Sequence, residues 1–329
     1  MLGDLTASAQ APRQASSFVA FRVDDRHAVA VLAEVADQAD SVDGSQPAAR
    51  FGFEYRDADP AIVAAIPQAV LLVKQWTVHL APGRRVSASA GRIVHGGAAC
   101  TGLAGMLLQI DPPDQQAYAT RPEKYFVVEA ADGTKTADSP PPSRELPPID
   151  RPKLETLLNA LLKRELPAVR AEAAAEIDRL VTSDVAYQRR WALERRELDQ
   201  ALDAGKARLE FDVQAFDLER DGPPRYFVRA EWNIIGRPAF GAALWIKGGD
   251  PLTIVNQDLS TARWLRMFEF QGKVSPELYG LVLNVFDRDG DGWSEVLMAR
   301  GGYESNKLEL IELTPDGFVP TGISYSYGC

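Results

Sequence analysis

Nine consecutive residues near the C-terminus, 287–295, carry the pattern with the clearest chemical meaning. Acidic residues occupy the first, third, fifth and ninth positions, and a glycine occupies the sixth. Calcium is a hard cation that takes about six to eight oxygen ligands, and a glycine lets the chain turn tightly around it. The spacing therefore predicts a calcium site whose side-chain ligands are Asp287, Asp289, Asp291 and Glu295.

The residues on either side decide which kind of calcium loop this is. A helix–loop–helix site needs a bidentate carboxylate at position 12, but Met298 occupies that position. Short apolar runs at 281–286 and 296–299 flank the loop and are typical of strands. We therefore expect the loop to join two strands, with Glu295 closing the site and the backbone carbonyl of Trp293 as a further ligand. The alternative is a solvated acidic turn without a metal, although four neighbouring carboxylates repel one another unless a cation neutralises them.

This pattern resembles the calcium loops of FG-GAP and VCBS repeats, the blades of integrin alpha-like propellers. Those loops have the motif Asp-x-Asp-x-Asp-Gly-x-x-Asp between two strands, and Glu295 stands here where the motif has its last aspartate. The resemblance implies a propeller-like C-terminal domain in which Ca²⁺ has a structural role. The longer side chain of Glu295 would alter the geometry or the affinity of the site.

A second copy of the pattern lies upstream, where residues 216–222 align with 286–292. Both copies have acids at loop positions 1, 3 and 5 and glycine at position 6. The first copy has Pro223 at position 7 and Arg225 at position 9, so a permanent guanidinium charge replaces the closing carboxylate and we expect this loop to be metal-free. Each copy has the strand content of a propeller blade. The strands of the last copy are expected at 281–286, 295–300, 308–313 and 319–325.

Residues 153–206 have a helical pattern, because apolar residues recur every three or four positions. We expect Pro167 to interrupt the first helix, and two further helical stretches to follow, the last of them ending at Gly205. The exposed face of the last stretch is rich in arginine and glutamate. This composition favours a solvated face crossed by ion pairs over a basic docking surface.

The N-terminal part is predicted to be a disordered polar tail at 1–16 followed by a β-rich domain at 17–133. The run 70–80 is expected to be a strand, and 28–39 fits either a helix or a strand. Proline-rich residues 134–152 form the predicted linker. The expected fold is mainly β with a helical segment (α+β), in which 153–206 are helical and 207–329 form two β-repeat units with the calcium loop.

Composition limits the classes of partner. The chain of 329 residues has a net charge of −10, which argues against nucleic acid and anionic membranes. It has no apolar run long enough for a transmembrane segment. The small residues 6–11 resemble the end of a secretory signal without the apolar run that should precede it. Because calcium is abundant outside the cytoplasm, we expect a periplasmic or extracellular location, where Cys100 and Cys329 could form a disulfide or remain thiols.

Catalytic patterns are weak, and we predict no catalytic residues. His95 and Cys100 could form a nucleophilic pair, but a cysteine among small residues is more often buried or disulfide-bonded. His95-Gly96-Gly97 is expected to form a turn, since the chain has no Gly-x-Ser-x-Gly nucleophile motif. The acid pairs Asp24-Asp25 and Asp57-Ala58-Asp59 reveal nothing about the carboxylate separation that glycoside hydrolysis needs.

Aromatic residues indicate binding instead. Tyrosine and tryptophan crowd the last third of the chain, and Trp293 and Tyr303 are expected to be exposed and to contact a partner. The sequence thus predicts a secreted or periplasmic, non-catalytic, calcium-binding interaction protein. Its propeller-like loops give it a weaker resemblance to periplasmic inhibitors and immunity proteins that act against lytic effectors. Two alternatives remain open: a hydrolase with the repeats as an accessory module, and a surface adhesion or glycan-binding protein.

Overall fold

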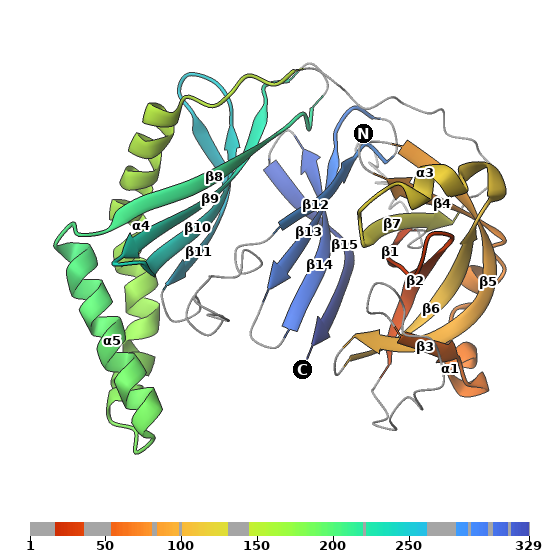
Figure 1. The fold of residues 1–329 in the computed structure, drawn as a ribbon, viewed down its shortest axis with the longest axis horizontal. Coiled ribbons are helices and arrows are strands. Elements are labelled where there is room, and N and C mark those ends of the chain that lie inside the picture. The colour runs from red at the N-terminus through yellow and green to blue at the C-terminus, as the bar shows by residue number, and fades with distance from the viewer. Residues whose placement is uncertain are drawn as a thin grey trace, which may run out of the picture. The chain divides into compact units, whose positions relative to one another are not determined.

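The computed structural model shows a mainly β chain with few helices, as expected (Figure 1). The contacts between residues divide the chain into two compact units. The first comprises residues 1–80, 85–135 and 323–325, and the second comprises 81–84, 136–322 and 326–329. The structure describes residues 17–35, 54–80, 84–98, 101–130, 145–219, 222–261, 281–288, 291–301, 305–314 and 317–328.

The first unit is built around a closed barrel. The strand order is β3-β5-β4-β7-β1-β2-β6, and β6 also pairs with β5, which closes six strands into a ring. Alternate side chains along the strands, such as Trp76, Val78 and Leu80, are buried in its core. The strands are β1 (Ser17–Arg22), β2 (His27–Val35), β3 (Glu54–Asp57), β4 (Gln75–Leu80), β5 (Arg84–Ala98), β6 (Thr101–Ile110) and β7 (Tyr125–Ala130). The short helices are α1 (Pro60–Ala65), α2 (Gln68–Leu71), η1 (Pro112–Asp114) and α3 (Gln115–Ala119).

Two expectations for this unit are resolved or corrected. Residues 28–35 of the ambiguous segment 28–39 belong to strand β2, and 36–39 lie outside the described residues. The strand predicted for 70–80 begins only at Gln75, because residues 68–71 form the turn of α2 after Pro67. Pro67 has a fixed φ and precedes the first residue of α2. The pattern of apolar residues does not reveal this short helix.

Arg22 is a buried cation at the end of β1 that sequence patterns did not single out. Only 1% of the residue is exposed. Its Nε donates to the carbonyl of Glu123 at 2.9 Å, its Nη2 donates to the carbonyl of Tyr118 at 2.8 Å, and its guanidinium lies 4.1 Å from the centre of the Tyr118 ring. These contacts tie β1 to the segment between α3 and β7.

The second unit contains two four-stranded sheets in which consecutive strands are neighbours, in the orders β11-β10-β9-β8 and β12-β13-β14-β15. This is the strand content predicted for two blade-like units, and the four strands expected in the last copy are all present. The first sheet has β8 (Arg208–Phe216), β9 (Arg225–Ile234), β10 (Arg237–Lys247) and β11 (Thr253–Thr261). The second has β12 (Leu281–Phe286), β13 (Glu295–Gly301), β14 (Ser305–Thr314) and β15 (Gly317–Gly328).

The sheets pack on each other through an apolar cluster. Phe227 and Trp245 of the first sheet meet side chains of β13 and β14, among them Val296 and Ile311. The opposite face of the first sheet, which includes Trp232, is covered by the helices. Helices, first sheet and second sheet therefore form successive layers (Figure 1).

Helix α4 (Arg151–Val181) passes through Pro167 without a break, so the predicted interruption is wrong. Its first half packs Leu154, Leu158 and Leu161 onto the sheet, and its second half packs on α5 (Ala186–Asp203). Burial of each leucine contributes about 1.5–3 kcal/mol, which together outweighs the cost of about 3 kcal/mol for one internal proline. The helix also starts at Arg151, inside the predicted linker, since a proline is tolerated in the first turn.

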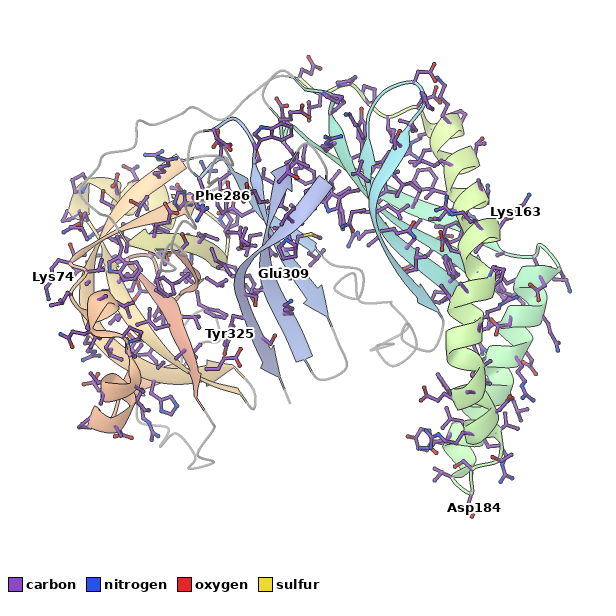
Figure 2. The ribbon with its side chains drawn as sticks, turned by 180° about the vertical axis from the view of Figure 1, so that it is seen from behind. Lys74, Lys163, Asp184, Phe286, Glu309 and Tyr325 are labelled. Carbon is purple, nitrogen blue, oxygen red and sulfur yellow. The ribbon has the colours of Figure 1, made fainter. Side chains whose placement is uncertain are left out.

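Three of the four arginines of α5 make ion pairs, as predicted, whereas Arg189 donates to the carbonyl of Ser183, and Arg195 is buried instead of lying on the exposed face. Arg190 contacts Glu194 at 3.2 Å, Arg196 contacts Asp178 of α4, and buried Arg195 contacts Asp199 at 3.1 Å. The helix ends at Asp203. Just beyond it, Gly205 has a φ of 66°, a left-handed conformation that is common after the last residue of a helix. Asp184 lies at the tip of the hairpin that the two helices form (Figure 2).

Candidate functional site

The acidic loop joins β12 to β13, as expected for a loop between adjacent antiparallel strands. Phe286 and Glu295 are cross-strand partners at its base. Gly292 has a φ of 92°, a left-handed conformation that strains residues with a Cβ, so the sixth position of the loop requires glycine. The Gly292 N–H donates to Asp287 Oδ2 at 3.1 Å, and the Trp293 N–H donates to Asp291 Oδ1 at 2.8 Å. The loop thus curls back on its own carboxylates.

Glu295 is held by a residue that the sequence analysis did not single out. It is 2% exposed, and its Oε2 and Oε1 accept hydrogen bonds from the backbone N and the side-chain Nε of Arg288, at 2.8 Å and 3.0 Å. A buried carboxylate needs a counter-charge or hydrogen-bond donors, and Arg288 supplies both. Arg288 at loop position 2 was a visible signal, because it is the only cation among these acids.

The residue types of the loop suit a calcium ion, but the described residues contain no group of three or more acidic, histidine or cysteine side chains placed to hold one. The carboxylates of Asp287, Asp291 and Glu295 come from both ends of the loop, and carboxylate oxygens have lone pairs beyond those used in the hydrogen bonds above. These residues and the carbonyl of Trp293 would hold the ion. When bound, calcium would supply positive charge that balances the acids. Asp289, the predicted third-position ligand, lies outside the described residues.

The upstream copy of the pattern occupies the equivalent place in the first sheet, because it joins β8 to β9. Its closing residue, Arg225, is buried, and its Nη2 lies 3.2 Å from Oε2 of Glu219 at loop position 3. Burial lowers the pKa of Arg225, and the carboxylate of Glu219 partly offsets that effect. This loop, 216–225, is called the arginine loop below.

The two loops contact each other directly. The Ser294 N–H donates to the carbonyl of Leu218 at 2.8 Å, and Glu219 and Trp293 form an antiparallel β-bridge. Ser294 is buried, and its carbonyl accepts from the N–H of Leu313 at 3.2 Å. The acidic loop is therefore hydrogen-bonded both to its own sheet and to the other one, an arrangement that the sequence repeat did not reveal.

The predicted aromatic binding residues have different outcomes. Trp293 is half-buried and packs against the cluster between the two sheets, so its expected exposure is wrong. Trp293 lies at the end of the acidic loop that leads into the interface between the sheets. Burial of the large apolar indole there stabilises the fold more than exposure to water would. Tyr303 lies outside the described residues, as do Cys100 and Cys329.

The weak catalytic candidates of the barrel do not converge on a pocket. His95 lies within strand β5 rather than in the predicted turn, and it is 8% exposed. Asp24 accepts bonds from the backbone N–H groups of Arg26 and His27 and contacts the His27 ring at 2.9 Å, all within one strand connection. A pocket of about 680 Å³ next to α1 and α2 is lined by Ala58, from the candidate segment Asp57-Ala58-Asp59, but by neither of the two aspartates and by no other acid or base.

A buried polar group in the barrel has the residue types of a catalytic triad in the wrong order. Glu129 lies between Ser17, whose hydroxyl donates to it at 2.8 Å, and His79, whose Nε2 is 3.1 Å away. A nucleophilic serine needs the histidine as its direct base, so this arrangement does not activate Ser17. It satisfies buried polar groups on β1, β4 and β7 instead.

Two glutamates face each other in the first sheet. Glu210 of β8 and Glu231 of β9 are direct cross-strand partners. Burial raises the pKa of Glu231 above its usual value near 4.5; Glu210 and Asp212 add to the increase, whereas Asn233 and Arg229 oppose it. Like charges directly opposite each other destabilise a sheet.

We therefore expect Glu231→Gln to stabilise the protein at neutral pH by about 0.5 kcal/mol, since it removes the half-buried charge and keeps the shape. When folding raises the pKa of an acid, protonation of that acid stabilises the folded state as the pH falls through the raised pKa. The wild type should therefore gain stability between neutral pH and about 4.5, and the variant should gain less. Urea unfolding at a series of pH values measures both. Glu197→Gln, on the exposed face of α5, is the control, and equal pH profiles for wild type and Glu231→Gln would contradict the prediction.

No helix of the described residues is long and apolar enough to cross a membrane. Comparisons of the chain with protein-family models, curated proteins and solved structures found no match.

Proposed function

We propose that this chain is a non-catalytic calcium-binding interaction protein of the periplasm or the extracellular space. One observation carries the proposal: the acidic loop between β12 and β13 curls around its own carboxylates with glycine in a left-handed conformation at position 6. The acidic side chains of this loop supply the hard oxygen donors that calcium prefers.

Calcium acts structurally in this proposal. The loop is hydrogen-bonded to the arginine loop through Ser294 and Leu218, so an ion that orders one loop also stabilises the junction of the two sheets. The partner is a protein, and an inhibitor or immunity role against a lytic effector follows from the resemblance to propeller-like periplasmic proteins. In this proposal the partner contacts the end of the two sheets that carries the acidic loop and the arginine loop.

The proposal predicts calcium-dependent capture of a partner. The full chain is immobilised and incubated with periplasmic or culture-medium extract in calcium, in chelator, and as the Asp289→Ala variant in calcium. A partner recovered by the wild type in calcium should be recovered at least tenfold less in the other two samples. Capture that is equal in all three, or catalytic turnover by the purified chain on cell-wall or ester substrates, would contradict the proposal.

A further inference from the structure

The turn between β9 and β10 holds an isoleucine in a backbone conformation that isoleucine avoids. Ile234 and Arg237 are cross-strand partners, so Ile235 and Gly236 form a two-residue turn between them. Their φ angles are 52° and 72°, both in the left-handed region, as a type I′ turn requires. Asparagine followed by glycine is preferred in such a turn, whereas the branched Cβ of isoleucine makes a positive φ costly. Ile235 therefore strains the turn that it forms.

Packing does not compensate for this strain. Ile235 is 98% exposed, although its neighbour Ile234 is only 6% exposed. A single exposed apolar residue is ordinary on a protein surface. An isoleucine that is both exposed and strained is not, because asparagine would suit the water and the turn better. Backbone strain that the fold does not need is typical of functional sites, so we looked for a binding role.

The surface around the turn is positively charged. Arg237 follows the turn directly, Arg208 lies in the part of β8 that pairs with the end of β9, and Lys206 lies just before Arg208. All three residues are exposed, and neither the connection from α5 to β8 nor the turn contains an acid. Arg208 contacts Glu210 at 3.6 Å, in a pair so exposed that it contributes little. The chain as a whole has a net charge of −10, so this end of the first sheet differs from the average surface.

We infer that Ile235 is the apolar centre of a second binding surface, which docks into an apolar pocket on a protein partner whose rim carries carboxylates. The isoleucine supplies the contact that becomes buried in the complex. Lys206, Arg208 and Arg237 attract and orient the acidic rim of the pocket. The strain at Ile235 is retained because the side chain that the turn would prefer, asparagine, cannot fill an apolar pocket.

A lipid surface fits these observations less well. One isoleucine inserts too little apolar area to hold a protein at a bilayer, where stable anchoring takes two signals. An anionic bilayer also extends over the whole facing side of a protein, so the net charge of −10 would oppose the attraction of the three cations. A protein pocket meets only the residues around the turn.

This surface is separate from the one in the proposed function. Strand β9 begins at Arg225 of the arginine loop and ends at Ile234, which places the turn at the other end of the first sheet, about 30 Å from that loop. Binding at the turn needs neither calcium nor the acidic loop. The inference therefore does not depend on the proposed function.

Thermal unfolding tests whether Ile235 serves the fold. Ile235→Asn should raise the melting temperature by about 2–4 °C, because asparagine tolerates the left-handed conformation. Ile235→Leu keeps an exposed apolar side chain in the same turn and should melt close to the wild type. A melting temperature of Ile235→Asn that does not rise would overturn the inference, since the isoleucine would then not be a strained residue retained for binding.

The binding test is carried out in chelator, so that calcium-dependent contacts do not contribute. The full chain is immobilised and incubated with periplasmic or culture-medium extract as the wild type, Ile235→Leu, Ile235→Asn and Arg237→Glu. The wild type and Ile235→Leu should recover the same acidic protein, and the other two variants should recover at least tenfold less of it. Recovery should also fall as salt is added, since salt screens the cations. Val185→Asn, which changes an exposed apolar residue at the start of α5, is the control and should recover as much as the wild type.

Two results would overturn the inference: equal recovery by the wild type and Ile235→Asn, or no acidic protein recovered by the wild type. Cosedimentation with vesicles of phosphatidylglycerol and phosphatidylcholine is measured in parallel. If the wild type binds these vesicles and Ile235→Asn does not, the turn contacts lipid and the protein partner is contradicted. A protein whose capture needs calcium but not Ile235 belongs to the proposed function, so the two proposals can fail separately.

Discussion

Asp289→Ala is expected to lower the melting temperature in calcium by several degrees and to abolish its dependence on calcium. A ligand that binds only the folded state stabilises it by about 2.7 kcal/mol at a concentration 100-fold above its Kd. The second unit has the size for which 1 kcal/mol shifts the melting temperature by roughly 2–4 °C. In chelator the variant should melt at the same temperature as the wild type or slightly above it, since removal of one carboxylate relieves repulsion among acids that no ion then balances.

The measurement is thermal unfolding followed by circular dichroism, with calcium and with chelator. Asp184→Ala is the matched control, because Asp184 is an exposed acid at the tip of the α4–α5 hairpin, remote from the loop in sequence (Figure 2). It should keep the full calcium response. An Asp289→Ala variant that melts like the wild type in calcium would contradict a structural ion.

Arg22→Ala is expected to destabilise the barrel by about 3 kcal/mol. It leaves the carbonyls of Glu123 and Tyr118 without their charged donor and removes the cation from the ring of Tyr118. Each buried acceptor that loses its partner costs about 1–3 kcal/mol. Because Arg22 is 1% exposed, water can replace these bonds only if the barrel opens.

Hydrogen exchange detected by mass spectrometry locates the effect. Amides of β1 and β7 should exchange faster in Arg22→Ala, and those of β9 and β10 should be unchanged. Arg26→Ala, a nearby exposed arginine in the β1–β2 connection, is the control. Exchange in Arg22→Ala that matches the control throughout would show that the buried guanidinium does not stabilise the barrel.

Local pattern predicted the blade-like part of the fold well. The strands at 281–286 and 295–301 flank the acidic loop as expected, because apolar alternation and a glycine-containing turn are short-range signals. The internal repeat likewise predicted that β8 and β9 flank the arginine loop. These elements form from neighbours in sequence, so their residues alone contain the information.

Long-range contacts could not be predicted in this way. The bond between Ser294 and Leu218 joins residues of different sheets, and the closure of β5 on β6 depends on the whole barrel. Helix α4 continues through Pro167 because tertiary packing on both sides exceeds the local penalty. Glu295 was predicted as a metal ligand, but its partnership with Arg288 appears only when the loop is folded.

X-ray diffraction from crystals grown in excess calcium tests the central claim most directly. The account predicts one anomalous difference peak within 2.3–2.6 Å, about the usual calcium–oxygen distance, of oxygens from Asp287, Asp289, Asp291 and Glu295 and of the Trp293 carbonyl. No peak should lie in the arginine loop, where Arg225 provides the charge. A loop without density for an ion at saturating calcium, with its carboxylates turned into solvent, would contradict the account.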